Sequence, residues 1–280
     1  MVTNLDLAEA GLKAADLLWR EGLAAEIDDP LDPEFAAAAV AEFAHLLSEH
    51  TPGILRDALE GAEKSAEQLS VEPLHGIIEV VQNADDAGAS RLRLAVRKRS
   101  GGRDLLFAHD GKPVRLPDVI AMVLAFVSTK RGDSMKKGRF GIGLKTLSAL
   151  GDTLSVHCGP YHVQITGNQL KQVLPAKGIN GFYQPDTSET LLELRLRAGF
   201  DEEQLSAWIK NRDASSLLFL DSVRSLGLFN LRSRKPIVEH RLEERGTEDS
   251  VIRFGRQTLA CTETRLEDHA SGCSWRRYLV

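Results

Sequence analysis

Three polar side chains project from one side of a helix that the sequence predicts at residues 76–88. Glu79, Asn83 and Asp86 are separated by four and three residues, which places them on one helical face. Apolar residues recur at helical spacing on another stripe of the segment, which is expected to face a core. Two carboxylates and a carboxamide in one row can orient water, hold a hard cation and bind a polar ligand. A solvated face of an amphipathic helix would show the same pattern, so the neighbouring motifs have to distinguish the two interpretations.

A second candidate lies in the turn His-Asp-Gly-Lys-Pro at residues 109–113. It follows a predicted strand at 104–109, which a Ser-Gly-Gly turn joins to an alternating strand at 91–97. Gly111 has no side chain, so the Asp110 carboxylate beside it can reach a ligand with little crowding. Most Asp-Gly pairs are only turns, and this signal alone is weak.

A third candidate is the basic, glycine-rich segment at residues 128–145, which runs into an apolar helix at 144–150. Glycines let backbone N–H groups converge on an anion, and the helix N-terminus adds partial positive charge. The segment lacks the GxxxxGK[ST] pattern of the Walker-type loop. A flexible solvated loop is the alternative interpretation.

The whole chain favours a soluble, cytoplasmic protein. Its 280 residues suit one large domain with extensions. A net charge of −5 argues against a free-standing nucleic-acid binder, and three cysteines without a CxxC pair fit a reducing compartment. No signal peptide and no membrane span is recognisable.

The predicted elements divide the chain into three parts. Residues 1–70 form a helical extension, with breaks before Pro33 and Pro52 that resemble helix starts. Residues 71–222 form the central domain, with strands at 153–158, 161–166 and 190–196 and helices at 202–211 and 214–220. Residues 223–280 form a β-rich extension that is expected to lead into further domains.

Taken together and in this order, these motifs resemble those of the GHKL superfamily of ATPases (gyrase, heat-shock chaperone, histidine kinase, MutL), and especially its sacsin-type branch. Residues 79–89 (Glu-Val-Val-Gln-Asn-Ala-Asp-Asp-Ala-Gly-Ala) look like the first motif of that branch. The turn at 109–113 occupies the place of the second, and residues 128–130 and 138–143 look like the lid and glycine motif. The likeness covers residues 74–228. It implies an α/β fold of the Bergerat type: a two-layer sandwich of a mixed, mostly antiparallel sheet with helices on one face.

The resemblance also implies roles for individual residues. Glu79 would be the general base, Asn83 would ligate Mg²⁺, and Asp110 would accept a hydrogen from the adenine amino group. Asp86 would shape the same helix face. The remaining implied ATP-binding residues are Gly111, Ser128, Thr129, Lys130, Gly138, Arg139, Phe140, Gly141, Ile142, Gly143 and Thr190.

The function implied is binding of ATP and Mg²⁺ with slow hydrolysis, which couples closure of a lid at about 129–138 to a larger chaperone-like or defence-associated assembly. The partners would be further domains or proteins, with an ATP-dependent dimer among the options. The alternatives are a non-hydrolysing nucleotide-responsive module and an ATP-gated DNA clamp. A histidine kinase is disfavoured because no suitable phosphoacceptor helix precedes the core.

The sequence departs from the superfamily pattern at the second motif, where D-x-G-x-G is usual and Asp110 is followed by Gly-Lys-Pro-Val. Glu189 also precedes Thr190 where glycine is common. Two groups of metal-ligand residue types do not have the spacing of a zinc site. They are His157, Cys158 and His162, and Cys261, His269 and Cys273.

Overall fold

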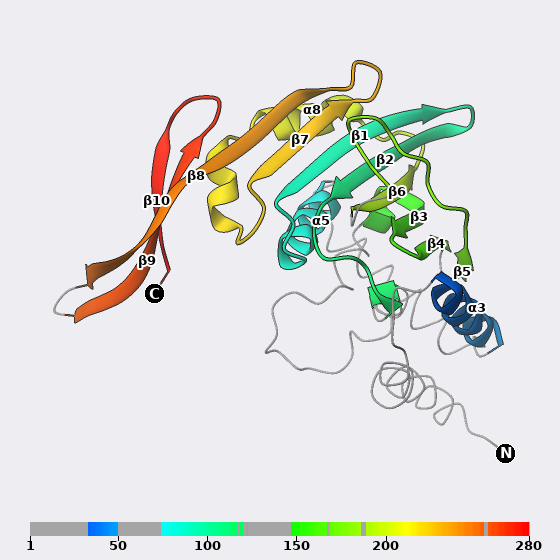
Figure 1. Ribbon diagram of the computed structural model, residues 1–280. Helices are drawn as coiled ribbons and strands as arrows, with labels where there is room; N and C mark the ends of the chain where they lie inside the picture. Colours follow the sequence, from blue (N-terminus) through cyan, green and yellow to red (C-terminus); the bar gives the residue numbers. More distant parts are fainter. Residues whose placement is uncertain are drawn as a thin grey trace.

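The computed structural model describes residues 33–49, 74–116, 118–119, 122, 147–166, 169–185, 189–254 and 257–279 (Figure 1). The expected lid and glycine motif at 128–143 lies outside the described residues. So do the helices expected before Pro33 and after Glu49, and with them most of the helical extension.

The described strands form one ten-stranded mixed sheet in the order β10-β9-β8-β7-β1-β2-β6-β3-β4-β5. All neighbouring strands are antiparallel except β1 and β7, which run parallel. The mixed α/β class expected from the sequence is therefore observed. The strands are β1 (Arg91–Arg99), β2 (Gly102–His109), β3 (Gly151–Cys158), β4 (Tyr161–Thr166), β5 (Gln169–Gln172), β6 (Thr190–Leu196), β7 (Ser225–Asn230), β8 (Lys235–Phe254), β9 (Gln257–Asp268) and β10 (Ser274–Leu279).

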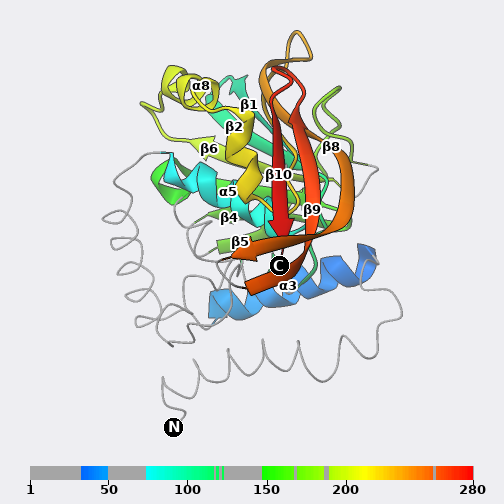
Figure 2. The same ribbon diagram turned by 90° about the vertical axis from the view of Figure 1, so that its left-hand side faces the viewer.

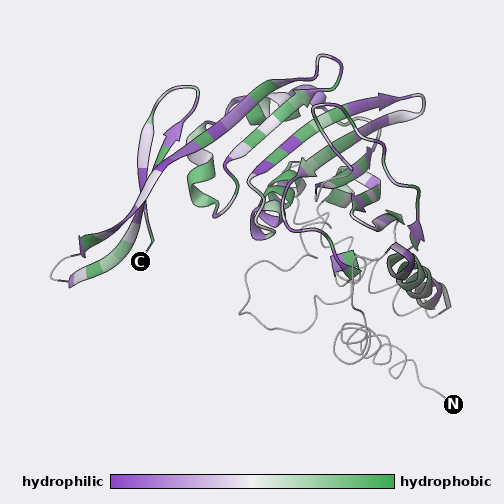
Figure 3. Cartoon of the chain, viewed as in Figure 1, coloured by the Kyte–Doolittle hydropathy of each residue, from purple (hydrophilic) through white to green (hydrophobic). Residues whose placement is uncertain are grey.

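Strand β1 shows how alternation separates the two faces of the sheet. Leu92 and Leu94 are fully buried on the face that α5 covers, while Arg93 and Arg97 point to the other face and form ion pairs there. The hydropathy colouring of β1 and β2 changes along each strand accordingly (Figure 3). The alternating pattern that predicted these strands is thus the pattern of their burial.

The described helices are α3 (Pro33–Glu49), α5 (His75–Asp86) and α8 (Glu202–Lys210), with 3-10 turns η2 (Leu147–Ala149) and η3 (Ala214–Phe219). Helix α8 begins after Asp201, whose carboxylate accepts hydrogen bonds from the backbone N–H groups of Glu203 and Gln204. Helix α5 is followed by Gly88 at φ +74°, a conformation that glycine adopts without strain. Within the described segments, no helix has the length and apolar character that crossing a bilayer requires.

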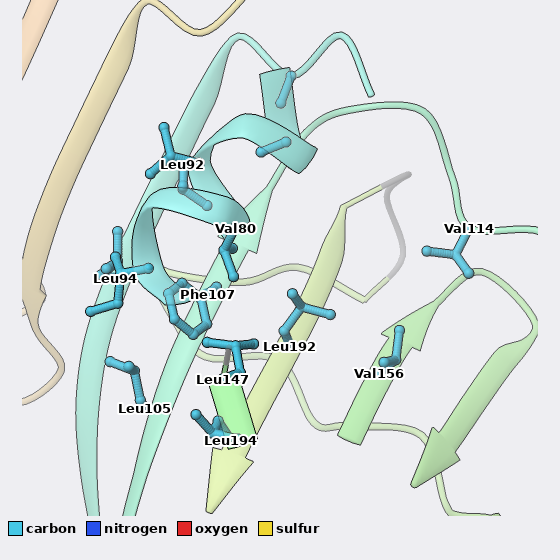
Figure 4. Close-up of a cluster of buried hydrophobic side chains, with 14 of the residues drawn as sticks. Val80, Leu92, Leu94, Leu105, Phe107, Val114, Leu147, Val156, Leu192 and Leu194 are labelled. Atoms are coloured by element: carbon cyan, nitrogen blue, oxygen red, sulfur yellow. The ribbon is translucent and has the colours of Figure 1, made fainter. Parts of the chain in front are cut away.

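The main core lies between these helices and one face of the sheet. Val80 of α5 packs among Leu92, Phe107 and Leu192 (Figure 4), and buried residues of α3, α8 and η3 belong to the same cluster. Burial of one such side chain contributes about 1.5–3 kcal/mol. This core fixes α5 against the ends of β2 and β6.

A smaller cluster lies on the opposite face of the sheet. Ala95, Leu106 and Leu191 are buried there beneath Phe182 and Tyr183, which come from the segment between β5 and β6. The same face carries partly buried ion pairs, including the buried Asp104 with the more exposed Arg195 at 2.7 Å.

The C-terminal strands form an arm that extends away from the central sheet. β8 pairs with β7 through Lys235–Arg241 and continues to pair with β9, on which β10 is added (Figures 1 and 2). The β-rich extension expected at 223–280 thus includes one strand of 20 residues, β8.

Candidate functional site

Helix α5 is held in place by a buried carboxylate at its C-terminal end. Asp85 accepts hydrogen bonds from three consecutive backbone N–H groups, those of Asp221 at 2.8 Å, Ser222 at 2.6 Å and Val223 at 2.9 Å. The side chain is 9 % exposed. These bonds tie α5 to the loop that leads into β7, so the polar face of α5 has a fixed position.

A cavity of about 280 Å³ opens beside that face. Helix α5 forms one wall, the ends of β2 and β6 form another, and the segment after β2 closes a third side. The lining is mainly apolar, with a few polar and charged side chains, the usual composition of a small-molecule site. The lining residues are Val80, Asn83, Ala84, Asp86, Ala87, His109, Lys112, Pro113, Val114, Arg115, Asp118, Met122, Thr190 and Leu192.

Two of the lining residues carry buried polar atoms that lack a hydrogen-bond partner. They are Nδ2 of Asn83, on α5, and Oγ1 of Thr190, at the start of β6. Thr190 is 1 % exposed. Its hydroxyl lies near the Cys158 thiol, whose pKa burial raises and this neighbour tends to lower, but the contact does not have the geometry of a hydrogen bond. Buried polar groups are normally paired, so an orphan amide and an orphan hydroxyl on one cavity indicate a place for a ligand.

His109 is the last residue of β2 and lines the cavity beside Thr190, its partner in the β2–β6 register. Burial lowers the pKa of His109 to about 4, despite the opposing charges of Asp110 and Glu189, so the ring is neutral at pH 7. Its Nδ1 accepts a hydrogen bond from the backbone N–H of Gly111 at 3.2 Å.

Gly111 allows the turn after β2 to approach the end of α5 closely. A Cβ atom at this position would lie 3.0 Å from both Cβ and the carbonyl oxygen of Ala87. Lys112 then donates its backbone N–H to the same carbonyl at 2.8 Å. The turn is therefore packed against α5, in a position from which the Gly111 N–H reaches the His109 ring.

Asp110, the residue expected to contact a base, has its carboxylate hydrogen-bonded at the start of β1. Its carboxylate accepts hydrogen bonds from the backbone N–H of Arg91 at 2.9 Å and from the Ser90 hydroxyl at 2.6 Å, and it does not line the cavity. Burial tends to raise the pKa of Asp110, but these hydrogen bonds and the Arg91 charge lower it below its ordinary value. Successive residues of an extended chain point to opposite faces, so Asp110 turns away where His109 turns inward.

Charged side chains lie at the rim of the cavity. Asp118 accepts a hydrogen bond from the backbone N–H of Arg115 at 2.8 Å, and burial raises its pKa. Burial and the nearby charges of Asp85 and Asp221 raise the pKa of Asp86. Lys112 and Arg115 add cationic groups. The cationic side chains of the rim can therefore bind the negative charges of a phosphate, and its carboxylates can bind a cation that accompanies the phosphate.

Glu79 lies one helical turn before Asn83, as its spacing predicts, but is not among the described residues that line the cavity. Its carboxylate is 3.5 Å from Nε2 of His75, and the side chain is 26 % exposed. Three of the expected site residues, Asn83, Asp86 and Thr190, thus line the cavity. Glu79, Asp110 and Gly111 are not among the described residues that line it.

Glu189, which stands where the superfamily pattern usually has glycine, has structural partners of its own. Glu189 is buried on the opposite face of the sheet, where it pairs with Arg91 at 3.1 Å and accepts a hydrogen bond from the backbone N–H of Gln184 at 2.9 Å.

Of the residues of metal-ligand type, His157 and His162 lie side by side, with their Nδ1 atoms 3.4 Å apart. In the part of the chain that the structure describes, no group of three or more His, Cys, Asp or Glu could hold a metal ion.

Comparison with known proteins finds similarity among solved structures alone. No protein-family model matches the sequence, and no curated protein matches it. Among solved structures, the ATP-binding domain of topoisomerase IV from Francisella tularensis, in complex with a small-molecule inhibitor, shares 13 % identity at a TM-score of 0.39. The alignment covers 62 % of this chain and 91 % of that one.

Proposed function

We propose that this chain binds a nucleoside triphosphate together with Mg²⁺ in the cavity between α5, β2 and β6, and hydrolyses it slowly. The observation that carries the proposal is the presence of two unpartnered buried polar atoms, Asn83 Nδ2 and Thr190 Oγ1, on one mainly apolar cavity. A planar base suits the apolar walls, and its polar edge would pair the Thr190 hydroxyl, while Asn83 would serve the phosphate end. ATP is the nucleotide that the sequence motifs imply.

The cationic rim supports an anionic ligand. Lys112 and Arg115 both line the cavity, and both follow β2 in the turn that packs on α5. Positive side chains of this kind form charge-assisted hydrogen bonds to phosphate oxygens. The expected contributions of Ser128, Thr129, Lys130 and residues 138–143 to the phosphates remain part of the proposal.

Asn83 is the residue that fits Mg²⁺. Its carboxamide is at the cavity, its nitrogen has no partner, and its oxygen is of the type that Mg²⁺ prefers. When bound, the ion would neutralise phosphate charge. Asp86 would support this end of the site, where burial has already raised its pKa.

Glu79 would act as the general base. It follows from the helical spacing that its carboxylate is on the same side of α5 as Asn83. There it would hold a water by a hydrogen bond and accept its proton, a contribution typically worth 10²–10⁴ in rate, as an order of magnitude.

The wider role that we propose follows the sacsin-like motif order. Nucleotide binding would close a lid at about 129–138, and further domains or protein partners would bind the closed state. The division of the chain at residues 70 and 222 and an ATP-dependent dimer belong to the same proposal. In this proposal the long arm of β8–β10 would connect the nucleotide-binding domain to those further domains or partners.

Calorimetric titration of the full chain with ATP, with and without Mg²⁺, tests binding, and phosphate release tests turnover. We expect Mg²⁺-dependent binding by the wild type. Glu79→Gln should still bind but lose phosphate release by about 10²-fold or more. Asn83→Ala should lose the Mg²⁺ dependence. If no nucleoside di- or triphosphate binds at millimolar concentration, the proposed function is wrong.

A second function is favoured by the position of Glu79. Its carboxylate faces His75 at 3.5 Å and does not line the described cavity. This arrangement suits a module that binds a nucleotide and changes shape without turning it over. Nucleotide binding together with phosphate release that Glu79→Gln does not change would select this alternative.

A further inference from the structure

The hydrogen bond between Gly111 and His109 determines which ring nitrogen carries the proton. A backbone N–H can only donate, so Nδ1 of His109, which accepts it at 3.2 Å, is unprotonated. The ring is neutral at pH 7, because burial lowers the pKa of His109 to about 4. The single proton therefore lies on Nε2, for which no described residue is a hydrogen-bond partner.

His109 and Thr190 give the buried part of the cavity a donor character. His109 Nε2–H is one donor. The hydroxyl of Thr190, opposite His109 in the register of β2 and β6, can donate as well. The carboxylate that the sequence implied for the base, that of Asp110, is engaged with Ser90 and Arg91, and those of Asp86 and Asp118 belong to the charged rim.

Purine bases differ in the edge that would meet these donors. The edge of a 6-oxopurine carries two neighbouring acceptors, O6 and N7. The same edge of adenine carries N7 and the 6-amino group, which donates. An amino group placed against an N–H leaves both donors unpaired, and unpaired buried polar groups strongly disfavour binding.

We propose that His109 is a specificity-determining residue and that the cavity prefers 6-oxopurine nucleotides, those of hypoxanthine and guanine, over adenine nucleotides. The inference rests on the proposed function, because it assumes that the base of a nucleotide occupies this cavity. The apolar side chains around His109 and Thr190, among them Val80, Val114 and Leu192, are the walls that a planar base would contact.

The test compares dissociation constants for IDP and ADP in the presence of Mg²⁺, because diphosphates are not turned over and differ here only at the base. We expect IDP to bind the wild type at least about tenfold more tightly than ADP, the effect of one mispaired buried donor. The diphosphate of unsubstituted purine riboside, which lacks the amino group, should bind more tightly than ADP. His109→Asp supplies an acceptor in place of the donor and should invert the order of IDP and ADP.

Asp110→Asn is the matched control, since it changes the neighbouring side chain outside the cavity and should keep the wild-type ratio. Nitrogen NMR of the wild type gives a readout independent of ligand: His109 should show a protonated Nε2 and an unprotonated Nδ1. ADP binding at least as tightly as IDP, or a ring protonated on Nδ1, would overturn the base preference while leaving nucleotide binding in place. If neither nucleotide binds, the proposed function fails, and the base preference with it.

Discussion

The backbone N–H of Gly111 lies 3.2 Å from Nδ1 of His109, two residues earlier in the same turn. The contact exists because Gly111 has no side chain and can pack against Ala87 at the end of α5. One glycine therefore links the position of α5, the course of the turn and the protonation pattern of the ring at the cavity.

Gly111→Ala tests this link. The added Cβ would lie 3.0 Å from two atoms of Ala87, so the turn must move away from α5. We expect a loss of about 1–3 kcal/mol in unfolding free energy, measured by denaturant titration. The ratio of IDP to ADP affinity should also fall, because the moved turn no longer holds Nδ1. Gly101→Ala is the control, since a Cβ there meets no atom within 4 Å, and equal stability of the two variants would contradict the close packing of Gly111.

Asp85→Asn tests the anchor of α5. The substitution keeps the size of the side chain but removes the charge and one of the two oxygens that accept three backbone N–H groups. Hydrogen bonds to a charged group contribute about 1.5–3 kcal/mol each, and we expect a net loss of roughly 2–4 kcal/mol. Asp249→Asn, at an exposed position of β8, should stay within about 0.5 kcal/mol of the wild type. A similar small change at Asp85 would show that the loop before β7 does not depend on it.

The sequence predicted much of the fold because its main signals are local. Alternation predicted β1 and β2, and helical spacing predicted α5 and brought Asn83 and Asp86 to one side. Alternation could also have pointed to His109, which the sequence analysis did not select as a site residue. Leu105, Phe107 and His109 alternate along β2 and point to the same face of the sheet, the face on which the cavity lies. The role of Asp85 could not be predicted, since its partners are about 136 residues away in the chain.

The stability of the protein should fall as the pH decreases from 7 to 4, in part because of His109. The pKa of His109 is about 4 in the folded protein and about 6.5 in the unfolded chain. The unfolded state therefore binds a proton first, and the stability present above pH 6.5 decreases as the pH falls. For one such group the decrease at pH 4 is about 3 kcal/mol.

The measurement is the unfolding free energy from pH 7.5 to 4 for the wild type and for His109→Gln, which cannot titrate. The difference between the two curves isolates His109 from the carboxylates and from His157, whose pKa burial also lowers to about 4. The His109→Gln curve should be flatter over this range. Parallel curves would mean that His109 is protonated as easily in the folded protein as in the unfolded one.

Thr190→Val separates binding from stability. The Thr190 hydroxyl is buried without a hydrogen-bond partner, so the isosteric valine removes an unpaired polar group. We expect the unfolding free energy to stay constant or to rise by about 1 kcal/mol, because an unsatisfied buried group destabilises the folded state by about that amount. Affinity for IDP should nevertheless fall about tenfold, since the ligand loses the partner that the hydroxyl provides. Thr153→Val, on the same sheet and outside the cavity lining, should leave affinity unchanged. A stabilised Thr190→Val variant with full affinity would show that the orphan hydroxyl does not face the ligand.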